Sequence, residues 1–188
     1  MRKNFGVKPW FYPLPVLIVG SYDENGQADA MNAAWGGLYD ANLVELCLSS
    51  GHKTTKNIKA TGAFIISFAD AKNVAKCDYV GIVSANNTPD KMEKAGFTVT
   101  KSSFVNAPII EELPMTLECR LKKVTEEGNI IGEIVNISVD DSILDENGQI
   151  DVDKLQPIAF DPVKNDYRVI GEKVGNCLLY TSPSPRDM

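Results

Sequence analysis

The sequence predicts one mainly β domain, in which short antiparallel strands form a barrel and a few short helices interrupt them. Three observations favour this class. Runs rich in β-branched residues recur along the chain, hairpin turn sequences separate neighbouring runs, and helical segments occur singly. A parallel sheet would need a crossover, usually a helix, between successive strands. The 188 residues, 44% of them hydrophobic, are enough to bury one core.

The first half of the chain contains four predicted strands. The first spans residues 15–22 and is followed by Asn25-Gly26, a pair that supplies the positive φ angles of a tight hairpin. A returning strand runs from residue 27 towards Trp35. Two further β-branched runs, 43–48 and 63–68, complete this set.

Three helices are predicted among these strands. The first lies within residues 49–62, with an N-cap among its Ser and Thr residues and Gly62 as its stop. The second lies near residues 71–77. The third has Thr88 as N-cap, a proline at its first position and Gly96 at its end.

The second half begins with a long hairpin. Residues 115–124 alternate apolar and polar side chains, residues 126–129 turn the chain, and residues 130–139 return it. The acidic segment 145–153 resembles a calcium loop, but its glycine falls too early among the oxygen ligands. We therefore interpret it as a solvated turn and predict no metal site.

Composition and missing motifs exclude several functions. The net charge of −6 disfavours nucleic acid as a partner. No apolar run reaches the ~20 residues that span a membrane, and the N-terminus has no apolar signal core, so we expect a soluble, cytoplasmic protein. Its four cysteines form no CxxC pair, which favours reduced thiols. No GxGxxG, Walker A or GxSxG sequence is present, and His52 is the single histidine. A lone histidine among polar loop residues is a weak candidate for a catalytic triad.

Two segments concentrate residues suited to ligand binding. In Met31–Gly37, small residues would let a flat ligand approach the backbone, and Trp35 could pack on an aromatic ring. Spacing alone favours a β-bulge with Trp35 in the core. In Ser49–Thr55, hydroxyls, His52 and Lys53 meet at a helix start, which suits an anion. An ordinary helix cap with a solvated lysine is an equal alternative.

A third segment, Cys77–Ser84, precedes the helix that contains Lys91. Asp78 and Tyr79 could line a pocket and Lys91 could add positive charge. The residue types favour core positions for Tyr79 and Val80 and a surface position for Lys91. Cys77 is most simply a small buried residue.

The order of these motifs resembles the flavin reductase-like, flavoredoxin-type family. The resemblance covers about residues 7–175 and rests on Pro-Leu-Pro-Val, Met-Asn-Ala-Ala-Trp-Gly-Gly, Ser-x-x-His-Lys-Thr-Thr-x-Asn-Ile, Cys-Asp-Tyr-Val-Gly-Ile-Val-Ser and Thr-Pro-Asp-Lys-x-Glu-Lys-Ala-Gly-Phe. The segments Pro157–Pro162 and Tyr167–Gly175 fit it too.

The resemblance implies a split barrel that binds flavin mononucleotide (FMN), usually as a homodimer. The residues implied along the flavin are Asn32, Ala33, Ala34 and Trp35. Those implied at the ribityl chain and phosphate are Ser49, Ser50, His52, Lys53, Thr54 and Thr55. Those implied to border the ring or close the pocket are Ser67, Phe68, Ala69, Cys77, Gly81, Ser84 and Lys91.

The implied function is an oxidoreductase that passes electrons from NAD(P)H through flavin to an unidentified acceptor, with the chemistry at the flavin. Two alternatives stay open: an electron-transfer flavoprotein without NAD(P)H turnover, and a flavin-free dimeric barrel that acts as a binding module. The family domain is expected over residues 1–175. Residues 176–188 resemble vector readthrough, and we predict that they are not native.

Overall fold

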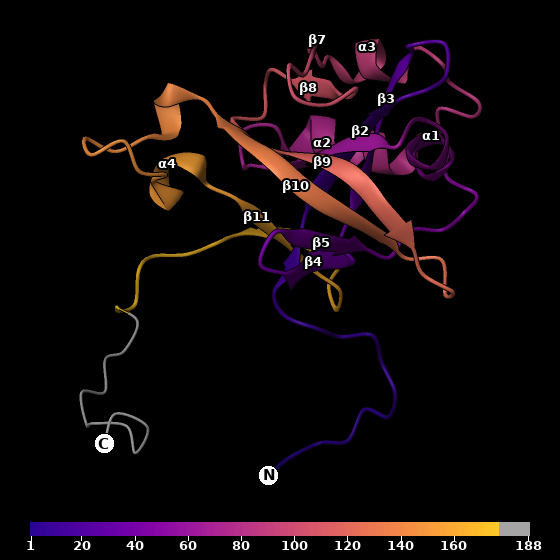
Figure 1. The fold of residues 1–188 in the computed structure, drawn as a ribbon. Helices are drawn as coiled ribbons and strands as arrows, with labels where there is room; N and C mark the ends of the chain where they lie inside the picture. The colour runs from indigo at the N-terminus through magenta and orange to yellow at the C-terminus, as the bar shows by residue number, and fades with distance from the viewer. Residues whose placement is uncertain (177–188) are drawn as a thin grey trace, which may run out of the picture.

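Seven strands form one antiparallel sheet in the order β3-β2-β6-β9-β10-β5-β4 (Figure 1). The computed structural model describes residues 1–176, so the tail from residue 177 onward lies outside the described residues. The strands of this sheet are β2 (Leu17–Tyr22), β3 (Ala28–Ala33), β4 (Gly36–Asp40), β5 (Leu43–Leu46), β6 (Ala63–Phe68), β9 (Met115–Val124) and β10 (Ile130–Val139).

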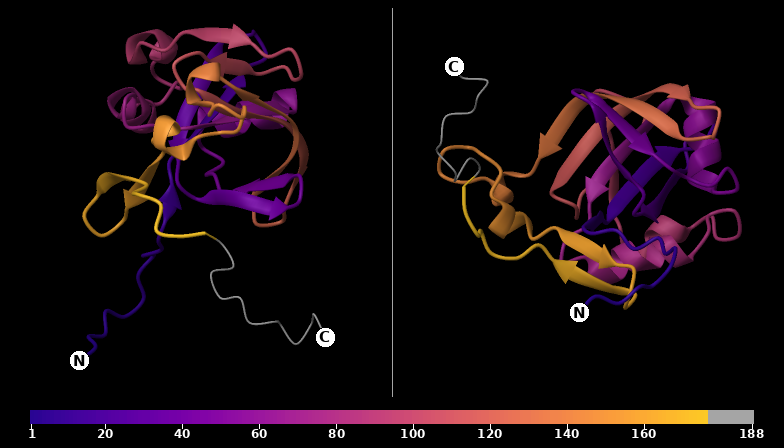
Figure 2. Two further views of the ribbon diagram at one scale, coloured as in Figure 1. Left: turned by 90° about the vertical axis from the view of Figure 1, so that its left-hand side faces the viewer. Right: turned by 90° about the horizontal axis from the view of Figure 1, so that it is seen from below.

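The two edge strands of this sheet, β3 and β4, are consecutive in the chain. Only residues 34 and 35 separate them. Since an extended chain advances at most about 3.6 Å per residue, the sheet must curl until its opposite edges nearly meet. The strands accordingly surround a common interior (Figure 2). The result is a barrel with one open seam, along which the outer edge of β3 has no neighbouring strand in the sheet.

Two apolar clusters hold the barrel and its outer layer together. The first fills the interior with side chains from β2, β5, β6, β9 and β10, including Leu46, Phe64 and Ile130, none of them measurably exposed. The second lies on the other face of β2 and β6, where helices α2 and α3 pack. Successive side chains of β2 and β6 point alternately into these two clusters, because successive residues of a strand face opposite sides of the sheet.

Three helices flank the barrel: α1 (Lys53–Thr61), α2 (Val74–Ile82) and α3 (Lys91–Ala95). The predicted stops at Gly62 and Gly96 are confirmed, since both glycines adopt left-handed angles, with φ of 71° and 72°. The predicted Ser/Thr N-cap of α1 is wrong, because residues 49–52 form a turn and His52 is the N-cap.

The other two helices begin later than predicted. Helix α2 starts at Val74, because the Asp70 carboxylate accepts hydrogen bonds from the backbone and side chain of Asn73 and holds a turn there. Helix α3 starts after Asp90, so the prediction of Thr88 as its N-cap is wrong. The Thr88 carbonyl instead accepts a bond from the Lys91 amide in the preceding turn.

The hairpin at residues 23–27 uses one positive φ angle rather than two. Gly26 has a φ of 80°, whereas Asn25 is not in the left-handed region. The loop is closed by two backbone bonds, from Asp23 N to Gln27 O and from Gly26 N to Asp23 O. A turn followed by one left-handed residue is the common three-residue alternative to the two-residue hairpin.

A second, three-stranded sheet joins the two ends of the described chain. It consists of β1 (Leu14–Pro15), β11 (Ile158–Asp161) and β12 (Asp166–Val169), in the order β1-β11-β12. The remaining elements are β7 (Val99–Lys101), β8 (Pro108–Ile110), the 3-10 helix η1 (Asp141–Ile143) and α4 (Val152–Leu155). The N-terminal arm, residues 1–13, extends from the body beside this sheet (Figure 2).

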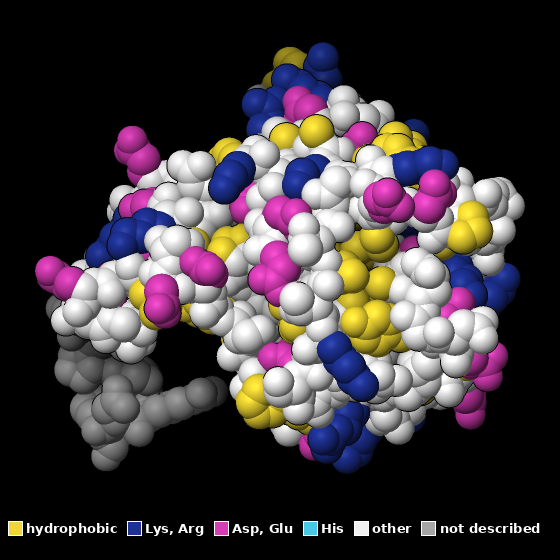
Figure 3. Space-filling view, turned by 90° about the horizontal axis from the view of Figure 1, so that it is seen from above, with side chains coloured by type: hydrophobic (Ala, Val, Ile, Leu, Met, Phe, Trp, Pro, Cys, Tyr) yellow, Lys and Arg dark blue, Asp and Glu magenta, His cyan; other side chains and the backbone are white. Residues whose placement is uncertain are grey.

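Charged side chains of both signs cover the outside. On the face that carries α3, β7 and β8, acidic and basic groups are interspersed around a hydrophobic area (Figure 3). On this face, therefore, neither sign of charge forms a cluster of its own. Within residues 1–176, no helix is long and apolar enough to cross a membrane.

Candidate functional site

A groove of about 270 Å³ lies between strand β3, the start of α1 and the C-terminal end of α2. We call it the β3 groove. Because β3 is an edge strand, the backbone N–H and C=O groups on its outer side are not used by the sheet and can bind a ligand. The residues that line the groove are Asp29, Met31, Asn32, His52, Lys53, Thr54, Val80, Gly81, Ile82, Val83, Ser84, Ala85 and Lys91.

The start of helix α1 forms one end of the β3 groove. The first amides of a helix have no acceptor within it, and here the N-cap residue His52 supplies no side-chain hydrogen bond to them. These amides and the helix dipole favour a negative group at this position. The start of α1 therefore has the geometry that suits an anion, with Lys53 beside it, and the anion site itself stays a prediction.

Two lysines approach this end, and each is paired with a carboxylate. Lys53 Nζ lies 3.2 Å from Asp23 Oδ2, in a pair that is partly exposed. Lys91 Nζ also lies 3.2 Å from its partner, Asp29 Oδ1, but that pair is buried. The expectation that Lys91 lies on the surface is therefore wrong. Thr54, another predicted ligand residue, directs its hydroxyl to Asp29 Oδ2 at 2.6 Å.

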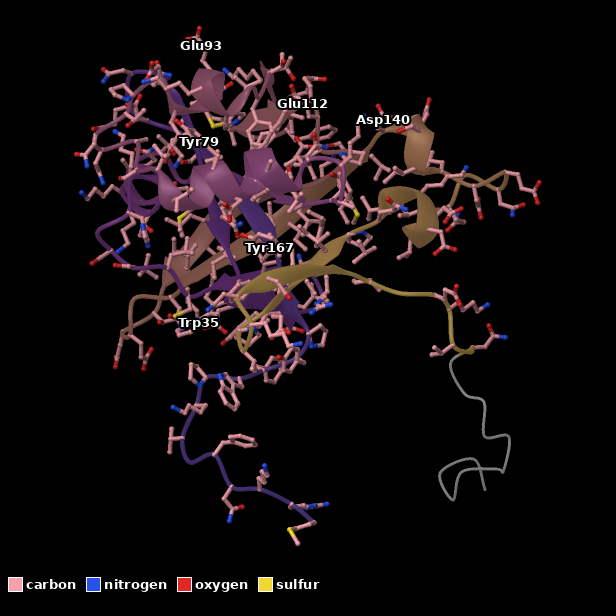
Figure 4. The ribbon with its side chains drawn as sticks, turned by 180° about the vertical axis from the view of Figure 1, so that it is seen from behind. Trp35, Tyr79, Glu93, Glu112, Asp140 and Tyr167 are labelled. Atoms are coloured by element: carbon pink, nitrogen blue, oxygen red, sulfur yellow. The ribbon has the colours of Figure 1, made fainter. Side chains whose placement is uncertain are left out.

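The predicted core position of Trp35 is also wrong, because its side chain is 57% exposed. The Trp35 backbone is held by a bond of 2.9 Å from Cys47 N to its carbonyl, which leaves the indole outside the barrel. Trp35 and Ala34 line a second pocket of about 650 Å³ between β4, β5 and the N-terminal arm. We call it the Trp35 pocket. Its residues Ala34 and Trp35 follow β3 directly in sequence, and β3 lines the other groove. Figure 4 shows Trp35 on the side of the barrel from which the N-terminal arm extends.

Asn32, in the β3 groove, is fixed by contacts with α2 and β12. Its Nδ2 donates to the Cys77 carbonyl at 3.3 Å and to the Tyr167 hydroxyl at 3.5 Å. A Cβ atom on Gly81 would lie 3.0 Å from the Asn32 Cβ, so a side chain at 81 would crowd it. Tyr167 lies on the C-terminal hairpin beside α2 (Figure 4).

The structure brings together only part of the predicted set. The β3 groove contains Asn32, His52, Lys53, Thr54, Gly81, Ser84 and Lys91, and the Trp35 pocket contains Ala34 and Trp35. Neither lining includes the other predicted residues, which are Ala33, Ser49, Ser50, Thr55, Ser67, Phe68, Ala69 and Cys77. Their roles as flavin ligands stay predictions.

Several of these other residues have structural partners. Ser67 is fully buried and shares a hydrogen bond of 2.7 Å with Thr116. Ala69 uses its backbone to bond Val16 and Ile158. Cys77 is buried as predicted, and burial raises the pKa of its thiol to about 12. Thr55 is fully buried too, and its hydroxyl has no hydrogen-bond partner among residues 1–176.

Sequence reasoning missed three residues of this region: Asp23, Asp29 and Tyr167. Asp29 had a detectable signal, because a carboxylate between two alanines is unusual inside an apolar strand. Asp23 looked like an ordinary turn residue, which it also is. Tyr167 had no signal of its own, since its partners lie 89 and 135 residues away in sequence.

The described residues form an antiparallel split barrel, with one open seam, short flanking helices and a groove at strand β3. The chain belongs to the flavin reductase-like family: the model named "Flavin reductase like domain" matches residues 11–159. The predicted family and fold class are therefore confirmed.

The structure is similar to that of the flavoredoxin of Desulfovibrio vulgaris (Miyazaki F), with a TM-score of 0.92 and 33% identity. The similarity covers 97% of this chain and 100% of that one. An FMN-binding domain of a flavin reductases-like enzyme from Shewanella baltica OS155 matches at a TM-score of 0.76. It is 18% identical, over 86% of this chain and 88% of that one, and shows the fold alone.

Among curated proteins, a relative from Aquifex aeolicus (strain VF5), described as an uncharacterized protein, is 34% identical over 112 residues. The match covers 56% of this chain and 55% of the relative. The chain thus spans about half the length of that relative.

Proposed function

We propose that this chain binds FMN along the seam of its barrel and acts as a flavin-dependent oxidoreductase. One observation carries the proposal: an uncapped helix start, with two lysines beside it, lies at one end of a free strand edge, and Trp35 follows the other end. The helix start and the lysines suit a phosphate, and Trp35 suits a flat aromatic ring.

The residues present fit such a ligand. The amides at the start of α1, with Lys53 and Lys91, would hold the phosphate. The outer backbone of β3, from Asn32 onward, would face the polar edge of the ring, and Trp35 would pack beside it. When bound, FMN supplies hydride acceptance and the release of electrons singly or in pairs. The protein orients the ring and restricts access to it.

For the electron donor and acceptor we propose NAD(P)H and a small molecule, in keeping with the membership of the chain in the flavin reductase-like family. An electron-transfer flavoprotein without NAD(P)H turnover is the second candidate. It is supported by the similarity to a flavoredoxin at 33% identity. A flavin-free binding module is disfavoured, because the uncapped helix start and buried lysine have no use in it.

We also propose that the chain forms a homodimer. Exposed apolar side chains are present on β4 and on the N-terminal arm. Leu38 of β4 is 76% exposed, and Tyr39 of β4 and Phe11 of the arm are exposed as well. Exposed apolar areas of this kind mark interaction surfaces. Sedimentation of the wild type and of Leu38→Glu checks this: a dimer that becomes a monomer in the variant supports it, and a wild-type monomer contradicts it.

The function is tested by purifying the chain and recording its visible absorption spectrum. Flavin bands, followed by heat release and chromatography of the chromophore against FMN, riboflavin and FAD standards, would identify the ligand. Oxidation of NADH and NADPH is then measured with and without added FMN. Turnover supports the reductase, bound FMN without turnover supports the electron-transfer protein, and failure to bind added FMN contradicts both.

A further inference from the structure

A single carboxylate connects three separate elements at the anion end of the β3 groove. Asp29 lies on β3, Lys91 is the first residue of α3, and Thr54 lies in the first turn of α1. Each of the two Asp29 oxygens has one partner: Oδ1 faces the Lys91 ammonium at 3.2 Å, and Oδ2 accepts the Thr54 hydroxyl at 2.6 Å. All three side chains are buried.

We infer that Asp29 is a positioning residue, which holds Lys91 and the first turn of α1 around one phosphate group. The inference rests on the proposed function. It concerns a residue that would not touch the phosphate itself: each carboxylate oxygen already has a partner on another element, and the negative charge would repel a phosphate. Its effect on the ligand would be exerted through Lys91 and Thr54.

The argument begins with the ammonium of Lys91. An ammonium has three donors, and Asp29 is its one hydrogen-bond acceptor among the described residues, so two donors stay available in a groove that Lys91 lines. A buried ammonium without a counter-charge tends to lose its proton or to move into water. Asp29 therefore supplies the counter-charge that a lysine in this buried position requires.

The second lysine pair of the groove provides an internal comparison. Lys53 and Asp23 are separated by the same 3.2 Å, but their side chains are 31% and 14% exposed, against 3% for both members of the buried pair. Water can replace Asp23 as the partner of Lys53, and exposed pairs contribute little energy. The Asp23 carboxylate also accepts hydrogen bonds from the backbone amides of Asn25 and Gln27, and the side-chain oxygen of an asparagine could accept them too.

The test compares FMN with riboflavin, which lacks the phosphate, on the full-length protein. In Asp29→Asn we expect the Kd for FMN to rise about tenfold, the loss of roughly one charge-assisted hydrogen bond. The Kd for riboflavin should change less than about threefold. In the matched control Asp23→Asn, both values should stay within about threefold of wild type.

A second variant guards against misfolding of the first. Asp29→Asn with Lys91→Met replaces the buried pair by neutral side chains of similar size, a change that proteins often tolerate. We expect it to fold with a Tm near that of wild type, to bind riboflavin normally and to bind FMN about tenfold more weakly.

Two results would overturn the inference. One is an equal loss of FMN and riboflavin affinity in both Asp29 variants, which would mean a general structural role. The other is wild-type FMN affinity in the double variant. A wild-type protein that binds neither flavin would instead remove the proposed function, and this inference with it, before any variant is compared.

Discussion

The Tyr167 hydroxyl donates a hydrogen bond of 2.7 Å to Asp78 Oδ1, and the Tyr167 hydroxyl oxygen accepts one of 3.5 Å from Asn32 Nδ2. One phenol thus fastens the C-terminal hairpin to α2 and to the edge strand that lines the candidate site. The Tyr167 ring also packs near Phe160 across the hairpin, with 6.0 Å between the ring centroids.

Removal of this hydroxyl should lower stability without a change in shape. We expect Tyr167→Phe to reduce the free energy of unfolding by about 1 kcal/mol, the usual value of one hydrogen bond. Tyr79→Phe is the matched control, since the Tyr79 hydroxyl has no hydrogen bond within the described part of the chain. It should change stability by less than about 0.5 kcal/mol. Urea denaturation of both variants measures this, and equal losses would contradict the assignment.

The same phenol should give stability a dependence on alkaline pH. Burial and the bond to Asp78 raise the pKa of Tyr167 to about 12 from its ordinary value of 10.0. The unfolded chain therefore releases this proton at lower pH than the folded one, so the contribution is complete below pH 10 and falls as the pH rises towards 12. The Tm of wild type minus that of Tyr167→Phe should shrink between pH 9 and 11. A constant difference would show that Tyr167 does not titrate as described.

Thiol reactivity should separate the cysteines by burial. Burial raises the pKa of both Cys77 and Cys119 to about 12, and reaction requires the thiolate. Cys47 is exposed at the Trp35 pocket. In a Cys177→Ser background, which removes the one cysteine outside the described residues, a disulfide reagent should modify one thiol rapidly in the native protein. It should modify three after denaturation. Rapid modification of three native thiols would show that the core is open.

Two strand glycines differ in the space around them. A Cβ atom on Gly132 would lie 2.8 Å from Phe64 Cε1 inside the barrel, whereas a Cβ on Gly37 would meet nothing within 4 Å. Gly132→Ala should therefore lower the free energy of unfolding by about 1–3 kcal/mol through overpacking. Gly37→Ala should leave it unchanged or slightly higher. Thermal denaturation of the pair checks this, and equal Tm values would be the contrary result.

The exposed indole should matter to the flavin ring and not to its phosphate. We expect Trp35→Ala to raise the Kd of FMN and riboflavin by the same factor, about tenfold, which is the order of one lost stacking contact. Phe104→Ala is the control, an exposed aromatic residue that lines neither the β3 groove nor the Trp35 pocket and lies outside the proposed dimer surface. Titration of each flavin by fluorescence measures all four values. A loss confined to FMN would place Trp35 at the phosphate instead.

Sequence patterns were sufficient where a signal is local. The bounds predicted for the long hairpin, residues 115–124 and 130–139, coincide with β9 and β10. Residues 115–124 alternate apolar and polar side chains, and the turn sequence at 126–129 marks where the returning strand begins. The helix stops at Gly62 and Gly96 were predicted from a local signal too, because a glycine after a helical segment readily adopts the left-handed angles of a C-cap. Strand β4 was missed, since its two glycines and exposed side chains give no alternation.

Tertiary relationships left no such signal. Lys91 looks like any helix lysine, and its burial follows from Asp29, which is 62 residues away in sequence. That β3 and β4 are the opposite edges of one sheet depends on the pairing of all seven strands. The family resemblance predicted where the candidate site lies, and the pairing of the strands explains why a free backbone edge is present at β3.

The pairing of β1 with β11 has a consequence for the order of folding. Leu14 pairs with Phe160, and Tyr12 bonds to Asp161, 149 residues away in sequence. During synthesis, β1 therefore has no partner strand until β11 (residues 158–161) has left the ribosome. Contacts of such long range form slowly, because closing a large loop is entropically unfavourable. The barrel can assemble from β2 to β10 first, and the last step pairs β1 with β11 beside the Trp35 pocket.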